Sequence, residues 1–184
     1  MSDIAVKRNI FTTKDLVMTA LMSVIIAVCS WISIPIGTVP FTLQTFAVFL
    51  SMLVLGGKRG TFAVLVYMML GAVGIPVFSG FKGGIGVILG TTGGYMLGFI
   101  IIGLVYMLAE KLSDENSIIC ISSLVIGLLL CYAFGTAWFI KVYSETKEID
   151  VMTALKWCVI PFIIPDIAKL GFAVLISGKV KKYV

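Results

Sequence analysis

The sequence of 184 residues contains no histidine, and only 12% of its residues are charged. Histidine is the usual general base near neutral pH and a common zinc ligand, so its absence excludes histidine-based catalysis and ordinary zinc sites. A soluble domain carries about 25% charged residues, so this composition also excludes a soluble protein. We therefore expect an integral membrane protein that is not an enzyme and that has no cofactor.

Cysteine pairs and nucleotide-binding motifs are also missing. Cys29, Cys120, Cys131 and Cys158 all fall within apolar segments, and none forms a C-x-x-C pair. They are predicted to be buried small hydrophobic residues rather than disulfide partners or metal ligands. The chain also lacks the G-K-[ST] sequence of a P-loop, so phosphate binding is not expected.

Hydrophobic residues make up 60% of the chain and are gathered in six runs. A transmembrane helix needs about 20 apolar residues. The first run is longer than the apolar part of a signal peptide and lacks a small-x-small cleavage site, so we interpret it as a retained helix. We predict one all-α integral membrane domain over residues 1–184, with spans at about 15–34, 41–57, 61–77, 86–109, 117–140 and 157–178.

The net charge of +5 comes from basic residues that mostly flank the apolar runs, so we interpret them as orientation signals rather than a nucleic-acid surface. Nine of them lie on one predicted side and four on the other. The positive-inside rule then places both termini in the cytoplasm, in agreement with an even number of spans. The richer side holds Lys7, Arg8, Lys14, Lys58, Arg59, Lys111, Lys179, Lys181 and Lys182, and the other holds Lys82, Lys141, Lys147 and Lys156.

An acid and a base interrupt the last apolar run, between Trp157 and Ser177. A charged side chain costs roughly 2.5 kcal/mol or more in hydrocarbon, so an ionisable residue at this depth indicates a functional site. Asp166 and Lys169 are three positions apart, which places them on one face of a helix. Pro165 suits the first position of that helix. The alternative is a structural pair whose charges neutralise each other.

The segment between the first two spans, residues 34–44, contains two prolines and a glycine but no charge. These residues prevent a continuous helix, and irregular backbone at membrane depth must be buried in protein or line a cavity. Thr42 and Gln44 would then supply a hydroxyl and an amide to that cavity. The alternative is an interfacial loop whose polar groups face water.

Residues 71–86 contain six glycines and one proline. Phe78 and Phe81 would be exposed at a cost in a solvated linker, so we expect a compact loop that dips into the membrane. Glycine lets backbone N–H groups approach a ligand closely, and the two phenylalanines offer apolar walls. Phe78, Ser79 and Gly80 are therefore predicted to contact a bound molecule.

Two patterns of small residues indicate close helix packing. Glycines recur every four residues within 86–98, and Tyr95 beside them is predicted to face the cavity rather than the membrane interface. Thr19, Ser23 and Ala27 in the first span have the same spacing. This groove fits either another helix of the chain or a docking partner, and spacing alone does not choose between them.

Together these features describe a small cavity that opens to the outside, with apolar walls, a few hydrogen-bonding groups and one acid–base pair. Such a cavity suits a small amphipathic solute that is neutral or anionic. Because the chain has no visible energy source, we expect it to need a partner to release its cargo inside.

Four motifs occur in order along the chain. They are V-P-F-T-L-Q at 39–44, G-I-P-V-F at 74–78, G-T-T-G-G-Y at 90–95 with Gly98, and P-F-x-x-P-D-I-A-K at 161–169. Together they resemble the BioY family, the biotin-specific substrate-binding (S) subunits of energy-coupling factor (ECF) transporters. One departure is Thr91-Thr92, where many members have a proline-containing turn.

The resemblance implies the S-component fold, with six transmembrane helices in the cytoplasmic membrane and biotin bound from outside. As partners it implies a coupling transmembrane subunit and two ATPase subunits, and no nucleic acid. The face formed by Thr19, Ser23 and Ala27 is similar to the one on which such subunits dock.

Biotin has a ureido ring with N–H donors and a carbonyl acceptor, an apolar thioether ring and a carboxylate. We hypothesise that Asp166 accepts a hydrogen bond from the ureido ring, while Thr42 or Gln44 binds other polar atoms. The rings of Phe78 and Tyr95 are predicted to cover the ligand.

Lys169 either pairs with Asp166 or meets the carboxylate of biotin, and the reversed orientation of the ligand stays open. The alternatives within transport are an S component for another vitamin and a solitary facilitator of a small solute. Outside transport they are an intramembrane enzyme that uses the acid–base pair and a purely structural membrane subunit.

Overall fold

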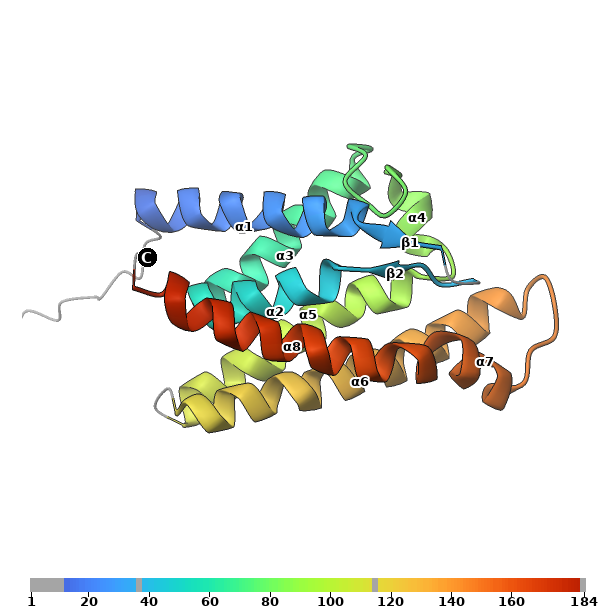
Figure 1. Ribbon diagram of the computed structural model, residues 1–184. Coiled ribbons are helices and arrows are strands. Elements are labelled where there is room, and N and C mark those ends of the chain that lie inside the picture. Colours follow the sequence, from blue (N-terminus) through green and yellow to red (C-terminus); the bar gives the residue numbers. More distant parts are fainter. Residues whose placement is uncertain (1–11, 36–37, 114–115, 183–184) are drawn as a thin grey trace, which may run out of the picture.

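The computed structural model describes residues 12–35, 38–113 and 116–182. These residues form a bundle of helices with one two-stranded hairpin (Figure 1). Lys7 and Arg8, two of the predicted orientation signals, lie outside them. The elements in chain order are α1 (Thr13–Trp31), β1 (Ser33–Ile34), β2 (Phe41–Thr42), α2 (Gln44–Leu55), α3 (Gly57–Ala72), α4 (Ile85–Leu89), α5 (Gly93–Leu112), α6 (Ser117–Tyr143), α7 (Val151–Cys158) and α8 (Ile160–Val180).

Four helical segments of the described residues are long and apolar enough to cross a membrane, namely α1, α5, α6 and the pair α7–α8. The other two predicted spans form shorter helices, since α2 has 12 residues and α3 has 16. At 1.5 Å per residue these reach about 18 and 24 Å, against about 30 Å for the hydrocarbon core. Either helix would need its adjoining connectors to complete a crossing.

The helix α2 lies at the centre of the bundle, between α1 and α8 in Figure 1. It contacts α1, α3, α5 and α8, and 11 of its 12 residues are buried. A helix that is apolar on all sides is buried because other helices must cover every face. The polar Ser51 is accommodated because its hydroxyl donates to the carbonyl of Val48 at 2.8 Å. Sequence and burial thus agree that α2 is the core helix.

Glycine allows α5 and α6 to pack closely. A Cβ atom on Gly94 would lie 2.3 Å from the Cβ of Trp138, and one on Gly98 would lie 2.4 Å from the sulfur of Cys131. Both distances are far shorter than a van der Waals contact, so only glycine fits at these positions without movement of α6. The predicted packing role is confirmed for this pair of glycines.

The prediction of one helix over residues 86–109 is wrong. The chain forms α4, breaks at 90–92 and resumes as α5. Gly90 has extended backbone with ψ −178°, and its carbonyl accepts hydrogen bonds from the backbone N–H of Gly93 at 3.1 Å and from the indole N–H of Trp138 at 3.0 Å. Glycine is a weak helix former, so this tertiary contact decides its conformation. The glycine stripe is therefore not continuous, and a Cβ on Gly86 would meet nothing within 4 Å.

The last predicted span, 157–178, is also divided. The helix α7 ends at Cys158, Val159 has φ −123° and ψ −57°, and α8 begins at the next residue. Pro161 occupies the first turn of α8, where the missing N–H would have no helical partner in any case. Pro165 lies inside α8, so the prediction that it opens the helix is wrong.

The small-residue face of α1 is buried within the chain, where α1 packs on α2 and α3. Thr19, Ser23 and Ala27 are all buried. The hydroxyl of Ser23 donates to the carbonyl of Ala63 in α3 at 2.9 Å. Small side chains let the two helices approach closely enough for this contact. The groove is thus used within the chain, and the predicted docking surface is not exposed in this structure.

Candidate functional site

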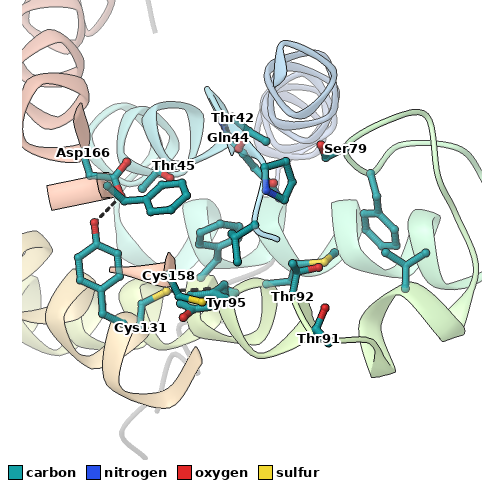
Figure 2. A pocket seen from close by; sticks show the side chains of 18 of the residues that line it. Thr42, Gln44, Thr45, Ser79, Thr91, Thr92, Tyr95, Cys131, Cys158 and Asp166 are labelled. Carbon is teal, nitrogen blue, oxygen red and sulfur yellow. Dashed lines mark hydrogen bonds between the residues drawn. The ribbon is translucent and has the colours of Figure 1, made fainter. Parts of the chain in front are cut away.

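A cavity of about 250 Å³ lies at the end of the bundle that carries β1, β2 and α4 (Figures 1 and 2). Its wall comes from the β1–β2 connection and the start of α2, from α3, from the turn at 78–82, from the α4–α5 break, and from α6, α7 and α8. Seven of the eight predicted substrate-binding residues lie on this wall. They are Thr42, Gln44, Phe78, Ser79, Tyr95, Asp166 and Lys169.

The acid–base pair is buried in the wall. Asp166 is 3% exposed and Lys169 is 6% exposed. Their spacing on α8 brings Nζ of Lys169 to 2.7 Å from Oδ1 of Asp166. The hydroxyl of Tyr132 on α6 donates to Oδ2 at 2.6 Å, the bond drawn as a dashed line at Asp166 in Figure 2. The carboxylate therefore has a charged donor on one oxygen and a neutral donor on the other.

Burial of both charges is tolerated because each is paired and hydrogen-bonded. The ammonium of Lys169 also lies 4.1 Å from the ring centroid of Phe41, and that ring stacks on Phe162. A carboxylate has about four lone-pair sites, so Asp166 keeps the capacity to accept a further hydrogen bond from a ligand. Lys169 pairs with Asp166 in this structure, which is one of the two arrangements that the sequence left open.

The sequence does not predict Tyr132 as a site residue. A tyrosine in an apolar span does need a partner for its hydroxyl, and this is the signal that points to it. The spacing of residues along the chain cannot show that α6 places this hydroxyl opposite α8, because the two positions are 34 residues apart.

The predicted polar residues of the first connector meet at the junction of β2 and α2. The connector forms a short hairpin in which Thr42 pairs with Ser33, so it is more regular than predicted. The backbone N–H of Gln44 donates to the hydroxyl of Thr42 at 3.3 Å, and its side-chain amide donates to the hydroxyl of Tyr67 at 3.0 Å. None of the described residues donates a hydrogen bond to the amide oxygen of Gln44, so this oxygen can accept from a ligand.

The turn at 78–82 contributes Phe78 and Ser79 to the wall but not Gly80. Gly80 instead serves the geometry of the turn, because its φ of +72° is one that side chains disfavour. Phe81 was expected to form an apolar wall, but it is 65% exposed and stacks on Trp31 with centroids 5.1 Å apart. The predictions for Gly80 and Phe81 as ligand contacts are therefore not supported by their positions.

Phe78 is held in place by α3. Its side chain is 1% exposed and meets the ring of Tyr67 edge-on, with centroids 5.5 Å apart. A Cβ atom on Gly71 would lie 1.9 Å from this ring, so the absence of a side chain there makes room for it. Phe78 thus presents a fixed apolar surface to the cavity.

Tyr95 lines the cavity from α5, on the side away from Thr42 in Figure 2. Its hydroxyl shares a hydrogen bond with Thr136 of α6 at 2.9 Å. The break before α5 adds the hydroxyl groups of Thr91 and Thr92 to the wall. In the sequence these two residues stand out only as a departure from a motif, and their place on the wall follows from the break in the helix.

Known proteins resemble this chain over almost its whole length. The model of the BioY family matches residues 4–184. A Thermotoga maritima protein named biotin transporter BioY is 44% identical over 170 residues, which are 92% of this chain and 96% of that protein. A Pyrococcus horikoshii protein named probable biotin transporter BioY is 40% identical over 168 residues, which are 91% and 96% of the two chains.

A solved structure is also similar. It is described as the S-component for biotin from an ECF-type ABC transporter, and it matches with a TM-score of 0.81 and 26% sequence identity. The match covers 92% of this chain and 91% of that one. From the family model and the sequence relatives together, this chain belongs to the BioY family.

Proposed function

We propose that this chain binds biotin as the substrate-specific S subunit of an ECF-type transporter and so serves biotin uptake across the cytoplasmic membrane. The observation that carries the proposal is the buried carboxylate of Asp166 on the wall of the cavity. The relatives named as biotin transporters and the solved S-component for biotin support the choice of ligand.

The polar residues of the wall match the polar groups of biotin. Asp166 accepts from an N–H of the ureido ring, and Lys169 holds the carboxylate in place through the 2.7 Å contact between Nζ and Oδ1. Thr42, Gln44 and Ser79, which line the same cavity, bind the remaining polar atoms of the ligand. Such a set of a few placed polar groups fixes the orientation of a small ligand.

The apolar part of biotin lies against two aromatic rings. Phe78 and Tyr95 both line the cavity, and each is held by contacts of its own, with α3 and with α6 respectively. Fixed rings cover a thioether ring without the loss of side-chain freedom that flexible residues would incur.

We place the protein in the membrane as one domain over residues 1–184, with six spans and both termini in the cytoplasm. The ion pair between Asp15 and Arg59, at 3.1 Å, joins the start of α1 to the start of α3. The backbone N–H of Gly57 donates to Glu110 at 2.8 Å and joins α3 to the end of α5. These ends and the end of α8 lie together in Figure 1, away from the cavity, which supports one basic, cytoplasmic end and an outward-facing cavity.

Transport then depends on other subunits. The sequence contains no P-loop, so ATP hydrolysis has to come from two ATPase subunits that act through a coupling transmembrane subunit. The docking surface for the coupling subunit is not assigned to Thr19, Ser23 and Ala27, because these residues are buried within the chain.

Calorimetric titration of the purified protein in detergent tests the proposal. Biotin should bind saturably at about one molecule per chain, as expected for one cavity of this size. Dethiobiotin keeps the ureido ring and the carboxylate and should also bind, whereas an unrelated vitamin should not. If the folded protein bound no biotin, the proposed function would be wrong.

A further inference from the structure

The charges on the cavity wall do not balance. Among the described residues that line the cavity, three are charged, namely Asp166, Lys169 and Lys82. Asp166 and Lys169 neutralise each other at a distance of 2.7 Å. The wall therefore carries one net positive charge, and this charge belongs to Lys82. A cavity with this balance favours a ligand with one negative charge.

Lys82 approaches the cavity from a different side than the acid–base pair. It ends the turn that begins at Phe78, and these two residues exchange backbone hydrogen bonds at 2.9 and 3.3 Å. Residues paired directly across an antiparallel bridge point to the same face, and both side chains line the cavity. Figure 2 shows Ser79 of this turn and Asp166 on opposite sides of the cavity.

The backbone that carries Lys82 is well fixed. Gly80 and Phe81 both adopt positive φ, at 72° and 57°, to close the turn. The ring of Phe81 stacks on Trp31, whose indole N–H donates to the carbonyl of Pro76 at 2.9 Å. The turn is therefore tied to the end of α1 as well as to α3, so its position does not depend on a bound ligand.

The side chain of Lys82, in contrast, is exposed. Within residues 12–35, 38–113 and 116–182, its ammonium forms no ion pair and no side-chain hydrogen bond. Because the backbone is already fixed, only the side chain of Lys82 has to be ordered when its free ammonium binds an anionic group.

We propose that Lys82 binds the carboxylate of the ligand and makes the site selective for the anionic form. The ureido ring then lies at Asp166 and the carboxylate tail at the 78–82 turn. The reversed orientation is disfavoured because it takes the ligand carboxylate away from Lys82 and brings it to an ion pair whose charges already neutralise each other. This role for Lys82 rests on the proposed binding of biotin.

The test compares biotin with biotinamide, in which a neutral amide replaces the carboxylate. The wild-type protein should bind biotin about tenfold more tightly than biotinamide, as expected for one charge-assisted hydrogen bond at an exposed site. The Lys82→Gln variant should lose this preference by binding biotin more weakly, with its affinity for biotinamide unchanged. Lys82→Arg keeps the charge and should retain most of the preference.

Two controls isolate the charge of Lys82. Lys147→Gln removes an equal charge from an exposed loop residue that does not line the cavity, so it should leave both affinities unchanged. Raising the salt concentration should reduce the preference of the wild type for biotin, since salt screens an exposed charge. A merely structural role for Lys82 would not produce this salt dependence.

The outcomes separate the two proposals. If the wild type binds neither compound, the biotin assignment itself fails. If the wild type binds biotin and Lys82→Gln keeps the wild-type preference, the carboxylate lies elsewhere and the role of Lys82 is refuted. Equal weakening of both ligands by Lys82→Gln, or an absent preference in the wild type, would refute it as well.

Discussion

Replacing Asp166 by asparagine should destabilise the protein as well as weaken biotin binding. The change removes the partner of the Lys169 ammonium, which lies 2.7 Å from Oδ1 on a side chain only 7% exposed. Removing one partner of a buried pair costs about 3–5 kcal/mol, because the other charge stays buried and uncompensated. For a chain of this size 1 kcal/mol corresponds to roughly 2–4 °C in Tm, so Tm in detergent should fall by roughly 6–20 °C.

The double variant Asp166→Asn/Lys169→Met should separate stability from binding. Neutral groups of similar volume often replace a buried ion pair without loss, and asparagine still offers an oxygen to the hydroxyl of Tyr132. The Tm should therefore return to within about 3 °C of the wild type. Biotin affinity should remain about 10- to 150-fold lower, because a hydrogen bond to a charged acceptor contributes about 1.5–3 kcal/mol.

Thermal unfolding and calorimetric titration in one detergent measure both quantities. Asp150→Asn is a matched control, because Asp150 is exposed and caps α7 through the backbone N–H of Met152 at 3.0 Å, a role that asparagine also fills. This variant should keep the wild-type Tm and affinity. If the double variant bound biotin as tightly as the wild type, the acid–base pair would be structural only, and the functional interpretation of Asp166 would be wrong.

Two further changes address how the wall is held in place. Tyr132→Phe should lower biotin affinity about 2- to 10-fold with little change in Tm, because it removes the 2.6 Å hydrogen bond that orients the carboxylate of Asp166. An unchanged affinity in calorimetric titration would show that this bond is dispensable for binding. Gly71→Ala should lower both Tm and affinity, by about 1–3 kcal/mol in stability, because the new Cβ would lie 1.9 Å from the ring of Phe78. Gly171→Ala is the control, since its Cβ would meet nothing within 4 Å, and equal behaviour of the two alanine variants would refute the packing argument.

The sequence predicts well those site residues whose signal is local. Asp166 and Lys169 stand out because any charge in an apolar run is costly, whatever the rest of the fold. Thr42 and Gln44 stand out because prolines beside them interrupt a span. The burial of all four cysteines follows in the same way from their apolar surroundings.

The roles of Tyr132 and Lys82 cannot be obtained in this way, because they depend on contacts between distant segments. Tyr132 matters through a residue on another helix, and Lys82 through a turn that is tied to both α1 and α3. The helix break at Gly90 likewise depends on an indole donor 48 residues later in the chain. Helix boundaries and positioning residues therefore require the tertiary structure, even where the residues of the site itself do not.

The errors in the predicted helix boundaries have a common physical cause. Three of the predicted spans that border the cavity are interrupted beside it. The helix α2 begins only after a hairpin. The span that holds α4 and α5 breaks at Gly90, and the span that holds α7 and α8 breaks at Val159. Each interruption adds wall residues, which are Thr42 and Gln44, Thr91 and Thr92, and Cys158. Backbone groups freed at membrane depth must be satisfied within the protein or face a cavity, so a binding site is where such breaks are tolerated. Glycine and proline in an apolar run thus indicate where the binding site lies, even where the helix boundaries predicted from them are wrong.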